Sequence, residues 1–99
     1  MASTTTRQST VPFQSPNGFH RSSEAPNALT ASVADCFKHD GGQGQIVIKK
    51  LQTVDGESFW QVERWLYRDG NFWREATFAE QSRSEVHERV CEETNIIRR

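Results

Sequence analysis

Two Asp-Gly pairs, Asp55-Gly56 and Asp69-Gly70, constrain the fold of this chain more than any other feature of its sequence. Each pair separates segments that are rich in apolar and aromatic residues. Asp-Gly is the strongest short-range signal for a β-hairpin, because a type I′ turn needs positive φ at both central residues. The sequence therefore predicts three antiparallel strands, over residues 45–54, 58–68 and 71–78.

If each turn has two residues, the register places Leu51 opposite Trp60 and Trp65 opposite Arg74. One face of the sheet then carries Val47, Leu51, Trp60, Val62, Leu66 and Trp73. The other face carries Ile46, Ile48, Phe59, Trp65, Tyr67, Phe72, Ala76 and Phe78. Because both faces are apolar, we expect helices to cover one of them and a partner or a second copy to cover part of the other.

Helical patterns flank the predicted strands. Within residues 26–40, apolar side chains recur at helical spacing, and Gly41 fits a helix stop. These apolar residues are Leu29, Val33, Cys36 and Phe37. Within residues 82–95, Ser82 and Glu85 match a capping box. We therefore expect an α+β fold, a three-stranded antiparallel β-meander flanked by two helices in the order α-β-β-β-α.

Residues 1–23 are rich in Ser and Thr and contain no acidic residue. This composition predicts a disordered N-terminal tail, followed by a single small domain over residues 24–99. The same composition is typical of organellar transit peptides, so import through residues 1–23 is an alternative. Two cysteines make no disulfide framework, and no apolar run is long enough for a transmembrane helix. We therefore expect a cytoplasmic protein that does not enter a membrane.

The spacings Cys36-x-x-His39 and His87-x-x-x-Cys91 bring together four residues of types that bind zinc. Cys36 also fits a buried apolar position, where cysteine is common. We interpret all four residues as structural and expect no metal, no other cofactor and no catalytic activity. Five carboxylates near the C-terminus fit the solvated face of a helix: Glu80, Glu85, Glu88, Glu92 and Glu93.

The charge balance argues against a strong nucleic-acid site. The chain has 12 basic and 13 acidic residues, a formal net charge of −1, and no part of it is strongly basic. The predicted order over residues 26–95 is similar to that of double-stranded-RNA-binding domains. Residues 82–90, however, contain only Arg83 and Arg89 where that family has a basic cluster, so we assign no family. The alternative function is weak nucleic-acid binding on the sheet through Lys49, Lys50, Arg64 and Arg68.

The aromatic sheet favours protein binding instead. Cross-strand neighbours would stabilise it, with Arg64 paired to Glu75 and Trp65 beneath Arg74. Trp, Tyr and Arg anchor many protein interfaces, and edge strands of a sheet pair with other chains. We expect a small non-catalytic adaptor or regulatory protein that binds a protein partner, or a second copy, through an aromatic face or an edge strand. The expected contact residues are Trp65, Tyr67, Phe72, Trp73 and Arg74.

Overall fold

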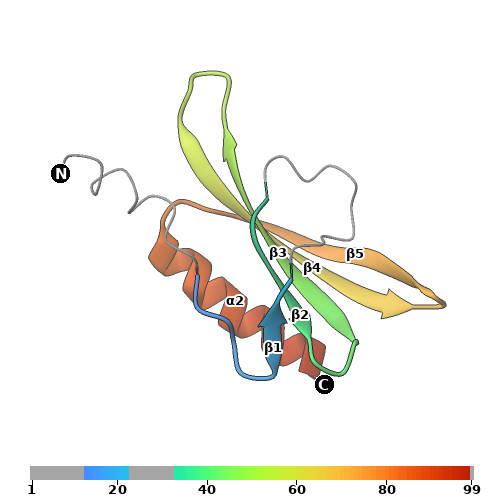
Figure 1. Cartoon of the computed structure of the whole chain (residues 1–99). Coiled ribbons are helices and arrows are strands. Elements are labelled where there is room, and N and C mark those ends of the chain that lie inside the picture. Colours follow the sequence, from blue (N-terminus) through green and yellow to red (C-terminus); the bar gives the residue numbers. More distant parts are fainter. Residues whose placement is uncertain (1–12, 23–32, 99) are drawn as a thin grey trace.

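The computed structural model describes residues 13–22 and 33–98. Within them, one antiparallel sheet of five strands, in the order β1-β2-β3-β4-β5, carries a single helix, α2, on one face (Figure 1). The elements are β1 (Phe19–Arg21), β2 (Val33–His39), β3 (Gly44–Gln52), β4 (Ser58–Arg68), β5 (Asn71–Glu80) and α2 (Arg83–Arg98). Each strand therefore pairs with the strand that precedes it in the chain.

The predicted fold class, a three-stranded meander flanked by two helices, is wrong. The antiparallel sheet is confirmed, but it has five strands, and α2 is the only helix among the described residues. Residues 33–39 of the predicted first helix form β2, whereas residues 26–32 lie outside the described part of the chain. Cys36 and Phe37 are both buried, on opposite faces of the sheet. A strand buried on both faces lacks simple alternation, so its apolar residues matched helical spacing by coincidence.

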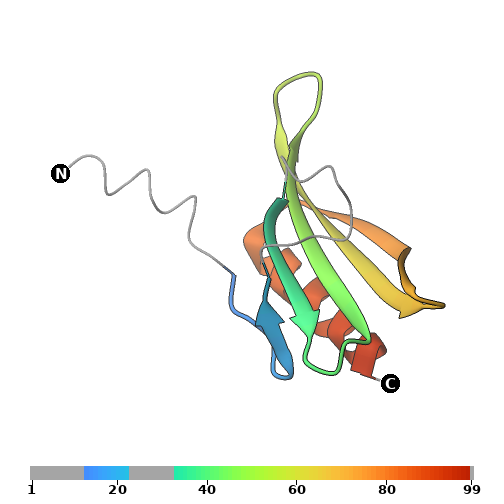
Figure 2. The same ribbon diagram turned by 45° about the vertical axis from the view of Figure 1, so that its right-hand side comes forward.

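Residues 13–22, which were predicted to be part of the tail, lie against the domain and contribute β1 to the sheet (Figure 2). Phe19 of β1 pairs with His39 of β2. Phe13 is only 3% exposed, and its ring packs edge-on against Trp60 with 5.1 Å between the ring centroids. Phe13 and Phe19 thus anchor this segment in the core that α2 covers.

The β3–β4 hairpin differs from the predicted register by one residue. Leu51 opposes Phe59 rather than Trp60, because three residues separate the hydrogen-bonded pair Thr53 and Glu57 in the turn. A shift of one residue moves every side chain of a strand to the other face relative to its neighbour. The helix-covered face therefore holds Ile46 and Ile48 beside Trp60 and Val62, and the opposite face holds Val47.

The β4–β5 hairpin starts in the predicted register and then departs from it. Asp69 has φ 53° and Gly70 has φ 81°, as a two-residue type I′ turn requires. A bulge farther along the hairpin makes Arg64 oppose Ala76 instead of Glu75. The expected ion pair between Arg64 and Glu75 still forms, with 3.7 Å between nitrogen and oxygen. Bulges of this kind bend a strand and increase its twist.

The helix α2 begins with the predicted capping box. The backbone N–H of Ser82 donates to Glu85 Oε1 at 3.1 Å, and the backbone N–H of Glu85 donates to Ser82 Oγ at 3.2 Å. The buried side of the helix includes Val86, Val90 and Ile97, and it packs mainly on β3 and β4. The larger of the two apolar cores therefore lies between α2 and the sheet.

Candidate functional site

We call the sheet face away from α2 the open face. None of the described helices or strands lies on it (Figure 2). Side chains directly opposite one another on neighbouring strands share a face, so the register defines its members. They include Cys36, Lys38, Gln45, Val47, Lys49, Gln61, Glu63, Trp65, Tyr67, Phe72 and Arg74.

A buried carboxylate lies at the centre of the open face. Glu63 is 0% exposed. Its Oε1 accepts a hydrogen bond from Trp65 Nε1 at 3.0 Å, and its Oε2 lies 3.2 Å from Lys49 Nζ and 3.1 Å from Arg74 Nη1. A buried charge is tolerated only when it is paired and hydrogen-bonded. These contacts from β3, β4 and β5 therefore hold Glu63 in place.

Cations lie over the aromatic rings of the open face. The Arg74 guanidinium lies over the Trp65 ring, 6.0 Å from its centroid, which confirms the predicted cation–π contact. The Lys38 ammonium lies over the Phe72 ring, also at 6.0 Å. Tyr67 packs edge-on against Phe72, with 5.2 Å between centroids. The surface is therefore an aromatic platform beneath two positive charges.

The contact between Lys38 and Phe72 spans the open face. Lys38 lies on β2 and Phe72 lies on β5, and β3 and β4 separate the two strands. The long Lys38 side chain therefore extends across the sheet toward β5, where its ammonium lies over the Phe72 ring.

Four of the five predicted partner-binding residues lie together on the open face: Trp65, Tyr67, Phe72 and Arg74. Trp73 lies on the opposite side of β5, where its indole N–H donates to the backbone carbonyl of Arg68 at 3.1 Å. Tyr67 is 50% exposed and Trp73 is 55% exposed, whereas Trp65 is buried. Two large exposed aromatic side chains thus flank the end of the β4–β5 hairpin, one on each face.

The four residues predicted for nucleic-acid binding do not converge. Lys49 lies on the open face, paired to Glu63, whereas the other three lie on the helix-covered face. Lys50 Nζ lies 4.8 Å from the Trp60 ring centroid, Arg64 pairs with Glu93 and Glu75, and Arg68 pairs with Glu75. Most of this positive charge therefore already has a protein partner.

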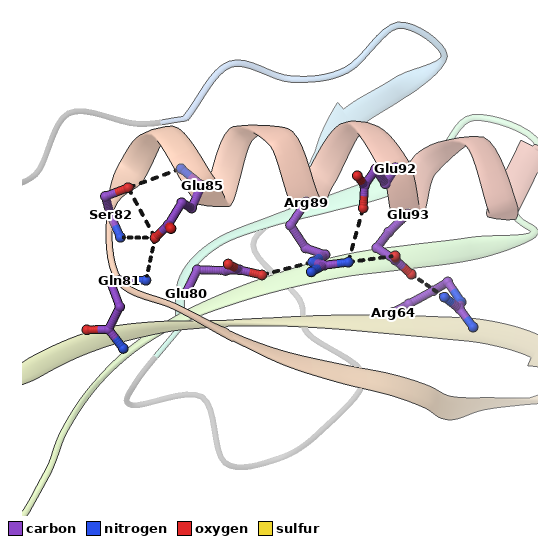
Figure 3. Close-up of polar contacts among 8 residues, drawn as sticks. All are labelled: Arg64, Glu80, Gln81, Ser82, Glu85, Arg89, Glu92 and Glu93. Atoms are coloured by element: carbon purple, nitrogen blue, oxygen red, sulfur yellow. Dashed lines mark hydrogen bonds and ion pairs between the residues drawn. The ribbon is translucent and has the colours of Figure 1, made fainter.

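A second ion-pair network joins α2 to the sheet (Figure 3). Glu93, predicted to be on a solvated face, is buried and pairs with Arg64 of β4. Arg89 Nε lies 2.8 Å from Glu80 Oε2, and Arg89 Nη1 lies 3.0 Å from Glu92 Oε1. The hydrogen bond to Glu80 is the main cause of the raised pKa of the Arg89 guanidinium. This network fixes the helix on the sheet and lies away from the open face.

The four candidate zinc ligands are dispersed. Cys36 lies on the open face, the rings of His39 and His87 pack against Phe19 and Phe13, and Cys91 is exposed on α2. The described residues contain no group of three or more His, Cys, Asp or Glu side chains that could hold a metal ion. Burial raises the pKa of the Cys36 thiol to about 11, so this group is protonated near neutral pH.

A pocket of about 480 Å³ lies between the β2–β3 turn and the C-terminal end of α2. Tyr67 is among its lining residues, and the apolar part of its wall comes from the helix-covered side of the sheet. The other lining residues are Gly41, Gly42, Gln43, Leu66, Arg68, Ile96 and Ile97. Its size lies within the range of pockets that hold small molecules or single side chains.

Two residues that shape this site, Lys38 and Glu63, were not predicted from the sequence. Lys38 was assigned to a helix, so its place on the sheet was not visible. The position of Glu63 could have been predicted from the strand pattern. Alternate residues of a strand share a face, so Glu63 lies on the same face as Gln61 and Trp65.

No protein-family model, curated protein or solved structure matches this chain. The helix α2, the only one among the described residues, lacks the length and apolar character needed to cross a bilayer.

Proposed function

We propose that this protein is a small non-catalytic adaptor or regulator that binds a protein partner at the end of the β4–β5 hairpin. The observation that carries the proposal is the exposure of Tyr67 and Trp73, 50% and 55%, on the two sides of the same hairpin. Large exposed aromatic side chains are uncommon on a small domain and are typical of the residues that anchor protein interfaces.

The edge of the sheet supports the same proposal. β5 has ten residues and pairs only with β4, so one of its backbone edges has no strand partner among the described residues. Such an edge offers unpaired N–H and C=O groups to an incoming extended segment. A partner strand added there would lie beside Trp73 on one face and Phe72 and Arg74 on the other.

The chemistry of the open face supports a binding role rather than catalysis. Its central carboxylate, Glu63, is held by Lys49 and Arg74, and its thiol, Cys36, has a pKa raised to about 11. A general base or a nucleophile needs an accessible, suitably charged group.

The exposed thiol of Cys91 suits a reducing compartment, and we propose a cytoplasmic location on that basis.

Site-specific photo-crosslinking in the native cells tests the proposal. A benzophenone amino acid replaces Trp73, Tyr67 or, as control, Val54, which is fully exposed in the distant β3–β4 turn. We expect one identifiable protein, or a second copy, to be crosslinked from positions 73 and 67 and not from 54. The purified partner should then lose affinity for folded Trp73→Ala. Equal crosslinking from all three positions would refute the proposed site.

A further inference from the structure

We infer that the open face recognises an acidic peptide segment, whose carboxylates bind Lys38 and Arg74 above the rings of Phe72 and Trp65. This inference rests on the proposed protein-binding function and names the chemistry of the partner. Three features of the described residues support it: the distribution of charge, the availability of the two cations, and the way the rings are covered.

The open face is positively charged although the chain as a whole is not. Among the described residues it carries Lys38, Lys49 and Arg74 against the single carboxylate of Glu63, which leaves a formal charge of +2. The exposed carboxylates of the described residues lie in the turns, on the outer side of α2 and at the bulge of β5, where Glu75 pairs with Arg64 and Arg68 of the helix-covered face. They are Asp40, Asp55, Glu57, Asp69, Glu75, Glu85, Glu88 and Glu92. A negatively charged segment is therefore attracted to this face rather than to the helix.

Lys38 and Arg74 both have donors to spare. Lys38 forms no ion pair with any described residue, and its ammonium lies over the Phe72 ring. The Arg74 side chain is 48% exposed, and its Nη1 makes the ion pair with Glu63. A guanidinium has five N–H donors, so the remainder can bind a carboxylate from the solvent side. Both cations are thus positioned by the domain itself and can bind an external anion.

The rings of this face suit carboxylates better than nucleobases. Arg74 lies over the Trp65 ring, Lys38 lies over the Phe72 ring, and the Trp65 indole N–H is engaged by Glu63. A base that stacks needs an uncovered ring face, and a nucleic acid needs a row of cations along its phosphates. Here an incoming chain meets the cations first, so we favour an acidic peptide over a single-stranded nucleic acid.

Tyr67 adds an apolar requirement. Its side chain is 50% exposed and packs edge-on against Phe72, so it extends the aromatic platform of the open face. A peptide that places carboxylates beside Lys38 and Arg74 can pack a large apolar side chain on this ring. The expected ligand is therefore an acidic segment that contains one aromatic or large aliphatic residue.

The three indole N–H groups of the chain are internal probes for a test by ¹⁵N-resolved NMR. Trp65 reports on the open face, and Trp60 in the helix-covered core serves as the control. The probe is the short peptide acetyl-Glu-Glu-Asp-Phe-Glu-Glu-amide. Its uncharged counterpart has Gln for Glu and Asn for Asp, and a short oligothymidylate tests the nucleic-acid alternative. We expect saturable shifts of the Trp65 signal with the acidic peptide only, while the Trp60 signal stays in place.

Lys38→Glu and Lys50→Glu form a matched pair of variants. Each removes a lysine that lies over an aromatic ring and has no ion pair among the described residues, but the two lysines are on opposite faces. We expect Lys38→Glu to weaken peptide binding roughly tenfold and Lys50→Glu to leave it unchanged. The dispersion of the NMR spectrum verifies that both variants are folded.

Three outcomes would overturn the inference: no shift of Trp65 with the acidic peptide, equal weakening by both variants, or tighter binding of the oligothymidylate. If a partner is still crosslinked from positions 67 and 73 in that case, the protein-binding function stands and only the acidic chemistry is refuted. If crosslinking fails as well, the proposed function is refuted with it.

Discussion

The ammonium of Lys49 lies 3.2 Å from the carboxylate of Glu63, and both groups are largely shielded from water on a sheet face that no described helix covers. Lys49 belongs to β3 and Glu63 to β4, so the pair links neighbouring strands. Removing one partner from a buried ion pair leaves the other charge uncompensated. The pair is therefore a structural requirement of the open face.

We expect Glu63→Gln to lower the free energy of unfolding by about 3 kcal/mol, because the amide cannot neutralise Lys49. Urea denaturation followed by tryptophan fluorescence measures the change. The control is Glu57→Gln, in the exposed β3–β4 turn, which should have little effect. A loss no larger than that of the control would show that Glu63 is dispensable.

The two cysteines should differ in reactivity. Cys36 is buried with a pKa of about 11, whereas Cys91 is exposed, so iodoacetamide at pH 8 should modify Cys91 and spare Cys36 until the protein unfolds. Mass spectrometry of tryptic peptides distinguishes the two sites.

Because the unfolded thiol has a pKa near 9.0, Cys36 should also contribute stability below pH 9 that is lost as the pH rises to about 11. That part of the loss should be absent in Cys36→Ala.

Gly44 should tolerate no side chain. A Cβ at this position would lie 2.6 Å from the backbone carbonyl oxygen of Trp65, so the paired strands would have to separate. We expect Gly44→Ala to cost about 3 kcal/mol, at the upper end of overpacking effects. Gly70→Ala, which meets no neighbouring atoms but has positive φ, should cost about 1 kcal/mol. Chemical denaturation of both variants tests the order, and a reversed order would contradict the close approach.

Phe13 should behave as a core residue although it lies in a segment of tail-like composition. Its ring packs on Trp60 and lies 5.2 Å from the ring of His87. Phe13→Ala should therefore destabilise the domain by about 3 kcal/mol, whereas Gln14→Ala, at an exposed position, should have little effect. Thermal unfolding by circular dichroism measures both. Equal melting temperatures for the two variants would mean that the Phe13 ring contributes nothing to stability.

The two Asp-Gly turns explain how much of the sheet was predictable. Asp-Gly fits a two-residue turn, as at Asp69-Gly70, and it also fits a three-residue loop with positive φ at the glycine, as at Gly56. Local sequence does not distinguish these forms, yet the difference of one residue exchanges the faces of a whole strand. The contact of Trp65 with Arg74 was predictable because the second turn kept the expected register near it.

The missing strands have a different physical origin. β2 pairs with β3 through contacts that no local pattern encodes, and its burial on both faces imitates a helical stripe. β1 has only three residues, and its position depends on Phe19 and the more distant Phe13. Lys38 could not be identified as a site residue until β2 was known, since its place over Phe72 depends on the position of β2 in the sheet.

The contact between Arg98 and the backbone carbonyl of Asn17 joins residues 81 positions apart. Phe13 likewise needs His87 and Arg83 of α2 as neighbours. On the ribosome, residues 13–22 emerge before the helix that completes their binding site. The nascent chain therefore carries Phe13 and Phe19 without their final contacts until α2 has left the exit tunnel, so this domain cannot finish folding before that point.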